Sequence, residues 1–396
     1  MPNRQVRAKA SQFRGLNNAR DPRRLQTDWL TTGKNVDVQD DGTICRRPGA
    51  SLVEAGTFRA AYVTYDDSHM YVASAGQLYS FAGGGLTSIS SDLTPAYPVR
   101  FSEINGRVYV LNGPVKRVVQ GLEIRPWGLP VPTPPSVDPR GGALPAGDYE
   151  FAVSFRAPDG RESGLSARTR ATLSEPGSWR LAVPQEAGLE TLVYMATAGD
   201  SVLYRVGTTT QPTVDVGTSA LDLGVTATTE YRVPPPDGEV LAFSGGRALV
   251  GAYHPDLAMS VIWRSDPLSY ELFTLDEGFL AVPGQLRMLF PVTGGLVIGT
   301  NREIMFFDGE ELRTVLNYGV PHGVQGYADD EGMTMFWSLR GLVVVGPEGF
   351  QNLMDRVYSP EKTMSANAAI VQQNGYRKFI ALTRQRGAPY NAWRNN

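Results

Sequence analysis

The side chains that most often perform acid–base or metal chemistry are few and scattered in this sequence. The three histidines are His69, His254 and His322, and no two of them have the spacing of a metal-binding or zinc-protease motif. Cys45 is the single cysteine, which excludes an intramolecular disulfide and the zinc sites built from paired cysteines. We interpret the histidines as turn or surface residues and expect neither a metal site nor a cofactor.

Neighbouring carboxylates are the next candidates, because Asp and Glu pairs act as acid and base in glycoside hydrolysis. Such neighbours occur at Asp66-Asp67, Glu310-Glu311 and Asp329-Asp330-Glu331. Each set lies between apolar runs, where turns favour acidic residues. The chain also lacks a G-x-S-x-G nucleophile elbow and a P-loop. The sequence therefore predicts no catalytic residues and a protein that is not an enzyme.

Aromatic side chains could instead form a platform on which sugar rings or bases stack. The candidates occupy alternating positions in apolar runs: Tyr253, Trp263, Tyr318, Phe336 and Trp337. Alternation also places residues on the buried face of a strand, so we favour a role in the core. An exposed aromatic patch would favour an alternative function, that of a carbohydrate-binding or host-recognition propeller protein.

A short module that recurs along the chain must position any such residues. A turn, most often with Gly, leads into a short run of alternating apolar residues, and the clear copies are Asp66–Ala73, Ile104–Leu111, Ser244–Gly251, Thr293–Gly299 and Leu339–Val345. In the later part of the chain the copies recur every 40 to 50 residues or so, which is the size of a four-stranded propeller blade. We predict an all-β fold containing a β-propeller of about six short blades.

The third copy lies far from the second, which indicates an inserted domain. Pro-rich stretches mark the edges of the insertion, and its alternating runs with a Tyr149 start and a turn at 159–163 resemble a fibronectin type III β-sandwich. We predict four parts: an extended basic arm over 1–32, a first propeller part over 33–125, the sandwich over 126–237, and a second propeller part over 238–396. The 33–48 segment should form a hairpin that pairs with the last blade.

The charge of the chain is nearly balanced, with 37 Lys and Arg against 40 Asp and Glu. The exception is the arm, whose basic residues include Arg4, Arg7, Lys9, Arg14, Arg20, Arg23 and Arg24. It is interpreted either as a docking segment or as a solvated tail. The N-terminus has no apolar segment typical of a secretory signal, and no apolar run approaches the length needed to span a bilayer. We expect no membrane association.

Several motifs then resemble one family. The opening Phe13-Arg14-Gly15-Leu16-Asn17-Asn18 is followed by Asn35-Val36-Asp37, Gly42-Thr43-Ile44 and Arg46-Arg47-Pro48-Gly49. Further on, Trp263 to Tyr270 has the pattern W-x-S-x-P-x-x-Y, and Pro291–Thr300 precedes Phe306-Phe307-Asp308-Gly309. These segments resemble the phage virion propeller proteins called nozzle, tail tubular protein B or packaged-DNA stabilisation protein in short-tailed bacteriophages.

The resemblance implies a structural component of a bacteriophage tail. Family members assemble into rings, typically hexamers, below the portal and adaptor, and the ring encloses the DNA exit channel. The expected partners are other copies of the chain, the portal–adaptor and other tail proteins, and double-stranded DNA that passes without sequence specificity. The expected location is the virion, after assembly in the host cytoplasm. The basic arm would reach a neighbouring subunit or an acidic adaptor face.

Overall fold

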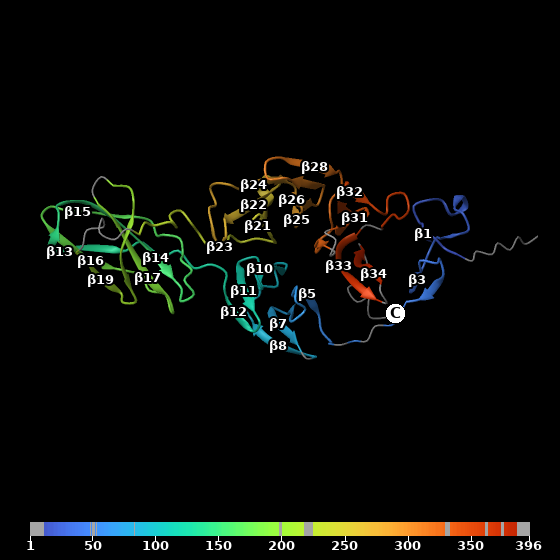
Figure 1. The fold of residues 1–396 in the computed structure, drawn as a ribbon, viewed down its shortest axis with the longest axis horizontal. Helices are drawn as coiled ribbons and strands as arrows, with labels where there is room; N and C mark the ends of the chain where they lie inside the picture. The colour runs from blue at the N-terminus through green and yellow to red at the C-terminus, as the bar shows by residue number, and fades with distance from the viewer. Residues whose placement is uncertain are drawn as a thin grey trace, which may run out of the picture. The chain divides into compact units, whose positions relative to one another are not determined.

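Among the residues that the structure describes, the assigned elements are strands, which pair antiparallel except for β1 with β2, and two 3₁₀ turns (Figure 1). The computed structural model describes residues 12–385 except 48, 50, 51, 53, 83, 198–199, 218–224, 329–332, 361–362 and 374–375. Contacts divide the chain into two units. Unit 1 comprises Met1–Thr57, Pro255–Met259 and Pro283–Asn396, and unit 2 comprises Phe58–His254 and Ser260–Val282.

Unit 2 begins with two four-stranded blades. Their strands are β5 (Phe58–Val63), β6 (Met70–Ser74), β7 (Gln77–Ala82), β8 (Gly85–Ser90), β9 (Arg100–Ile104), β10 (Arg107–Asn112), β11 (Val115–Gln120) and β12 (Glu123–Pro126). Each sheet follows chain order, β5-β6-β7-β8 and β12-β11-β10-β9, as in a propeller blade. Asn105 and Gly106 have φ of 53° and 67° in the two-residue turn between β9 and β10, which matches the predicted turn.

A third blade of unit 2 follows the insertion. Its strands are β20 (Val240–Ser244), β21 (Arg247–His254), β22 (Met259–Asp266), β23 (Ser269–Phe273) and β24 (Leu280–Pro283). The 3₁₀ turn η3 (Pro255–Leu257), which follows β21 in the chain, is assigned to unit 1. The face of the third blade packs on the second blade through Tyr109, Trp127 and Phe243, with the ring of Tyr109 edge-on to the other two rings.

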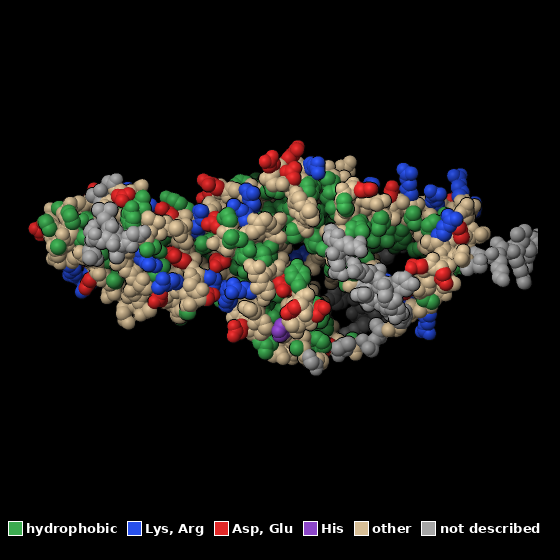
Figure 2. Space-filling model, viewed as in Figure 1, with side chains coloured by type: hydrophobic (Ala, Val, Ile, Leu, Met, Phe, Trp, Pro, Cys, Tyr) green, Lys and Arg blue, Asp and Glu red, His purple; other side chains and the backbone are tan. Residues whose placement is uncertain are grey.

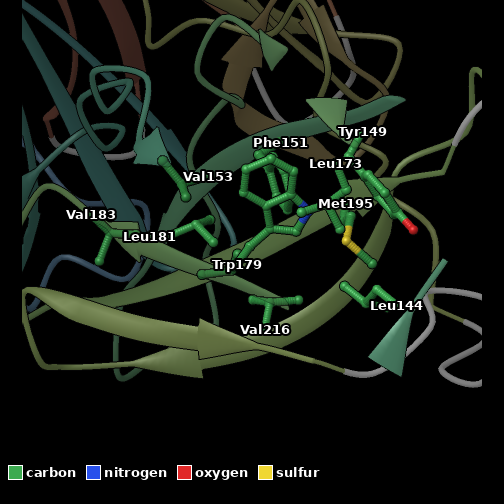
Figure 3. Close-up of a cluster of buried hydrophobic side chains, with 11 residues drawn as sticks. Leu144, Tyr149, Phe151, Val153, Leu173, Trp179, Leu181, Val183, Met195 and Val216 are labelled. Atoms are coloured by element: carbon green, nitrogen blue, oxygen red, sulfur yellow. The ribbon is translucent and has the colours of Figure 1, made fainter. Parts of the chain in front are cut away.

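The insertion is a seven-stranded sandwich. The strands are β13 (Ser136–Leu144), β14 (Gly147–Arg156), β15 (Thr169–Leu173), β16 (Gly177–Ala182), β17 (Glu190–Ala196), β18 (Tyr204–Thr209) and β19 (Thr213–Val216). They form two sheets, β13-β16-β19 and β15-β14-β17-β18. The core between the sheets centres on Trp179, which packs edge-on against Tyr149 and Phe151 (Figure 3). The Tyr149 hydroxyl donates to the Pro145 carbonyl at 2.7 Å, a tyrosine–backbone link of the kind seen at sandwich corners.

Both connections to the sandwich run along the third blade of unit 2. Trp127 Nε1 donates to the Tyr270 carbonyl at 2.9 Å, while Val233 and Phe273 exchange two backbone hydrogen bonds of 2.9 Å. A Cβ atom added to Gly128 would lie 2.6 Å from Pro235 Cδ, which shows how closely the entering and leaving segments pass. The sandwich is therefore joined to the blades of unit 2 by two fixed segments.

Unit 1 holds two more four-stranded blades and a long hairpin. The strands are β25 (Leu286–Val292), β26 (Gly295–Thr300), β27 (Ile304–Phe307), β28 (Leu312–Leu316), β29 (Tyr327–Ala328), β30 (Thr334–Ser338), β31 (Gly341–Gly346), β32 (Gly349–Asn352), β33 (Thr363–Gln373) and β34 (Tyr376–Gln385). One core contains Met288, Phe336 and Ala366, so it joins both blades to the hairpin. The predicted fold class, an all-β propeller with an inserted sandwich, is confirmed.

The N-terminal part of unit 1 contains short elements. They are β1 (Gly15–Leu16), the 3₁₀ turn η1 (Pro22–Arg24), β2 (Trp29–Leu30), β3 (Val36–Val38) and β4 (Ile44–Arg46). Strands β3 and β4 form the predicted hairpin, closed by Gly42 at φ 79°. Among the described strands, five sheets have the blade order, whereas β3–β4 and β33–β34 form two separate two-stranded sheets. The expected pairing of the 33–48 hairpin with the last blade is therefore not seen among the described strands, and a side-chain contact between Asp37 and Lys378 links the two hairpins instead.

Candidate assembly surface

The described part of the predicted arm is folded against the β3–β4 hairpin. Phe13 N donates to the Gly42 carbonyl at 2.7 Å, and Arg14 N donates to the Asp28 carbonyl at 2.9 Å. Strands β1 and β2 pair in parallel, and the Arg14 side chain forms an ion pair with Asp28 at 2.7 Å. Residues 12–30 thus form a hydrogen-bonded loop within the predicted arm. Arg4, Arg7 and Lys9 lie outside the described residues.

Asn18 fastens this loop to the C-terminal part of unit 1. Its side chain donates to the Ser359 carbonyl at 3.2 Å and accepts from Ser359 N at 2.7 Å. The backbone N of Asn18 also donates to the Val357 carbonyl at 3.2 Å. Three hydrogen bonds to one short segment fix both the position and the direction of the loop.

Asp37 makes a second link between the two ends of the chain. Its carboxylate accepts from Arg47 Nε at 3.0 Å and from Lys378 Nζ at 3.2 Å, so β3 is bound to β34. Partial burial raises the pKa of Asp37, but the hydrogen bonds and charges of Arg47 and Lys378 outweigh that effect. The pKa of Asp37 is consequently lowered from its ordinary value, and the carboxylate stays charged at neutral pH.

Three arginines project from the turn that this loop carries. Arg20, Arg23 and Arg24 are exposed, and none of them forms an ion pair with a described residue. Asp21 Oδ1 accepts from Arg23 N at 3.0 Å, which caps the turn. Pro22 occupies the first position, where its ring fixes the backbone angle φ at a value suited to a helical turn. Asp21 caps η1, which begins at Pro22. Figure 2 shows Lys and Arg side chains on the surface of this segment.

The histidines do not gather into a site. The His69 ring stacks on Tyr71 with centroids 6.0 Å apart, and the His254 ring lies edge-on to Trp263 at 5.9 Å. His322 belongs to unit 1, where its backbone N donates to the Met364 carbonyl at 3.0 Å. No group of three or more His, Cys, Asp or Glu side chains suited to a metal ion occurs among the described residues.

The paired carboxylates have structural roles where they are described. Asp66 accepts from the Ser68 backbone and hydroxyl, and hydrogen bonds from Thr64 and Ser68 lower the pKa of Asp66 to about 2. Asp308 accepts from the backbone N of Glu310 and of Glu311, which caps the β27–β28 turn. Asp329-Asp330-Glu331 lies outside the described residues. The turn interpretation is confirmed for the first two sets.

Most of the aromatic residues that were candidates for a stacking platform pack in or against the hydrophobic cores of the blades. Phe336 is fully buried and Trp337 is 7% exposed in the core of unit 1, while Trp263 packs on a core cluster of unit 2. Tyr318 lies beneath the Arg340 guanidinium, 4.9 Å from ring centroid to cation, and packs on the same core as Phe336. The core interpretation is confirmed for these four residues.

Sequence reasoning missed the two links that hold the arm. Asn18 and Ser359 are 341 positions apart, as are Asp37 and Lys378. No local pattern marks such pairs, because neither residue differs from an ordinary turn or strand residue in its own segment. The sequence did offer one indirect signal for such contacts. The expectation that the 33–48 hairpin pairs with the last blade already implies that the two ends of the chain lie close together.

Comparisons with known proteins give distant structural likenesses. No protein-family model matches the sequence, and no curated protein matches it. A structure of BBS1N in complex with ARL6DN has a TM-score of 0.34 at 10% identity, covering 83% of this chain and 90% of that one. Hsv2 of Kluyveromyces lactis has a TM-score of 0.28 at 10% identity, covering 76% of this chain and 77% of that one.

A third likeness is the extracellular domain of a putative one-component system from B. thetaiotaomicron. Its TM-score is 0.31 at 12% identity over 76% of this chain, and this chain spans 33% of that protein's length. Likenesses at this level carry no functional conclusion. In the described part of the chain, no helix is long and apolar enough to cross a membrane.

Proposed function

We propose that this protein is a structural component of a bacteriophage tail, in which copies of the chain form a ring around the DNA exit channel below the portal and adaptor. The observation that carries the proposal is the exposed arginine turn Arg20–Arg24, which is fixed on a hydrogen-bonded loop instead of hanging from a free tail. A rigid display of three guanidinium groups suits a protein surface that supplies carboxylates.

The motif residues behind the resemblance support the same proposal. Asn18 and Asp37 belong to the opening motifs. Asn18 ties the N-terminal loop to Ser359 in the segment between β32 and β33, and Asp37 ties the β3–β4 hairpin to β34. The motif therefore has a physical role, which is to place the arginine turn at a defined position on unit 1. A ring subunit needs such a fixed contact, because a flexible contact would not set the angle between neighbours.

Charge on the rest of the chain fits a channel that lets DNA pass. In the sandwich, Arg168 pairs with Glu150 and Glu230, and Arg180 pairs with Asp215 at 2.7 Å. In the blades, Arg117 pairs with Asp92 and Lys116 with Asp237. Cations that are already paired neutralise few phosphates, so passing DNA would be held weakly.

The experiment is a charge reversal of the turn in the full-length chain. We expect the triple variant Arg20→Glu, Arg23→Glu, Arg24→Glu to fold with an unchanged melting temperature and to lose incorporation into tails assembled with the neighbouring tail proteins. The control reverses Arg302, Arg313 and Arg356, which are also exposed in unit 1. Normal incorporation of the turn variant, or equal loss in the control, would contradict the proposed role of the turn.

A further inference from the structure

Three arginines of unit 2 come together where the second blade meets the sandwich. Arg161, in the turn between β14 and β15, has its Nε 2.7 Å from Asp159 Oδ2, and Arg125 on β12 has its Nε 3.9 Å from the same oxygen. Both arginine side chains also donate through Nη1 to the Pro126 carbonyl, at 3.4 Å and 3.5 Å. Because they share two acceptors, these two guanidinium groups are close neighbours.

The third arginine, Arg107, lies on the same face of the second blade as Arg125. Tyr109 pairs with Val118, and Val118 pairs with Arg125, so these three residues form one row across β10, β11 and β12. Side chains two positions apart on a strand share a face, which places Arg107 beside Tyr109. Arg107 is exposed and forms no ion pair or hydrogen bond with a described residue. Its guanidinium is therefore available to a ligand.

The Tyr109 hydroxyl is a buried polar group next to these arginines. Tyr109 is 3% exposed, its ring packs in the core between the second and third blades, and its hydroxyl has no hydrogen-bond partner among the described residues. Burial and then the charge of Glu271 raise the pKa of Tyr109, while the charges of Arg125 and Arg107 oppose this rise. The hydroxyl thus stays protonated at neutral pH and can donate. We call the following groups the arginine–tyrosine cluster: Arg107, Arg125, Arg161 and the Tyr109 hydroxyl.

The arginine–tyrosine cluster carries more positive charge than its ion pairs compensate. Asp159 pairs with Arg125 and Arg161, and none of the three guanidinium groups pairs with a second carboxylate of a described residue. Burial and then the charge of Arg161 lower the pKa of Arg125, while Asp159 opposes this shift and Arg107 adds to it. Arginine remains charged at neutral pH even so. The lowered pKa of Arg125 therefore reflects an electrostatic cost of holding these cations together, which a bound anion would reduce.

We propose that the arginine–tyrosine cluster binds one phosphate group, either as inorganic phosphate or as the terminal phosphate of a small molecule. Each guanidinium has five N–H donors, and most of these have no acceptor among the described residues. Donors that approach from several directions suit the tetrahedral oxygens of phosphate, whereas one guanidinium is enough for a carboxylate. The site is additional to the proposed ring and does not depend on it.

The depth of the cluster favours a small ligand over nucleic acid. The side chains of Arg125 and Arg161 are only 28% and 13% exposed, so two of the three guanidinium groups are recessed. A duplex is usually bound by cations that project along a stripe of the surface and reach several phosphates. A recessed cluster of this size is instead suited to one phosphate that enters it.

The test measures the melting temperature of the full-length chain in rising inorganic phosphate, with ionic strength held constant by chloride. We expect a saturating rise, because a ligand that binds only the folded state stabilises it. Isothermal titration with inorganic phosphate, a nucleoside monophosphate and a short DNA duplex then distinguishes the sources. Tighter binding of the monophosphate than of inorganic phosphate would identify a small phosphorylated molecule, and the reverse order would identify the free anion.

Two variants remove donors that have no partner in the folded chain. Arg107→Gln and Tyr109→Phe should keep the melting temperature without phosphate, because neither lost group bonds to a described residue. Each should weaken phosphate binding by about tenfold, the loss expected when one hydrogen bond to a charged group is removed. Arg59→Gln is the matched control, since Arg59 is also exposed in unit 2 and should leave phosphate binding unchanged.

The contradicting results are distinct. A rise in melting temperature that does not saturate, or that Arg107→Gln and Tyr109→Phe share with wild type, would show a general salt effect and overturn the site. Duplex binding that Arg107→Gln abolishes, without binding of inorganic phosphate or monophosphate, would overturn the small ligand and indicate a nucleic-acid contact. Neither result bears on the proposed ring, which is measured separately by its assembly.

Discussion

At the scale of single residues, the two ends of the chain are joined by a few polar contacts. Asp37 is the central one, because its carboxylate accepts from Arg47 and from Lys378, and its side chain is only 16% exposed. Removing its charge would leave Lys378 without this partner in a half-buried position. The contact is thus a small but specific contribution to holding β3 against β34.

Asp37→Asn should lower the free energy of unfolding by about 1 kcal/mol, the scale of a partly exposed charge pair. The pKa of Asp37 is lowered in the folded protein, so its contribution is complete above the ordinary value of 3.8 and is lost as pH falls through the folded value. Thermal melts between neutral pH and pH 3 or so should show a smaller acid loss in Asp37→Asn than in wild type. Asp40→Asn, exposed in the same hairpin, should behave like wild type.

At the scale of elements, local sequence patterns predict the individual hairpins and turns. Contacts between residues far apart in the sequence determine how these elements are joined. The β3–β4 hairpin and the glycine turns follow from neighbouring residues, since a turn residue fixes the register of the strands on either side. The loop formed by residues 12–30 could not be predicted in this way. Its partners Val357 and Ser359 lie at the other end of the chain, and the sequence pattern there suggests nothing but a turn.

The hydrogen bonds of this loop predict that an N-terminal truncation lowers the stability of the protein. Deleting residues 1–30 removes Asn18 and the buried Asn17, and therefore the hydrogen bonds to Val357 and Ser359. We expect the melting temperature to fall by several degrees, whereas the arginine-turn charge reversal leaves it unchanged. Differential scanning calorimetry of the two variants would check this, and equal melting temperatures would show that the loop adds nothing to stability.

The sandwich should fold as an element in its own right. Its main core is drawn from β13 to β19 alone, with Trp179 1% exposed at its centre. We expect residues 136–233 expressed alone to be soluble and β-rich by circular dichroism. In that fragment Trp179→Ala should cost about 3 to 5 kcal/mol, and the exposed Arg180→Ala should cost under about 1 kcal/mol. An unfolded wild-type fragment would mean that the contacts of Trp127 with Tyr270 and of Val233 with Phe273 are required.

At the scale of the whole molecule, the described residues form β-sheet scaffolds, and the exposed turn with Arg20, Arg23 and Arg24 makes no ion pair with any of them. A conduit should release the DNA that passes through it. We expect the full-length chain to bind duplex DNA at about 0.15 M salt no more tightly than about 10⁻⁴ to 10⁻⁶ M, the range of non-specific contacts. Fluorescence anisotropy with labelled duplex would measure it. Nanomolar binding that survives reversal of the arginine turn would favour a dedicated DNA-binding protein.

Electron microscopy of the full-length chain, alone and together with the neighbouring tail proteins, tests the ring most directly. We expect closed rings of a single size with an open central channel. Particles that remain single subunits under both conditions, or open filaments without closure, would contradict it.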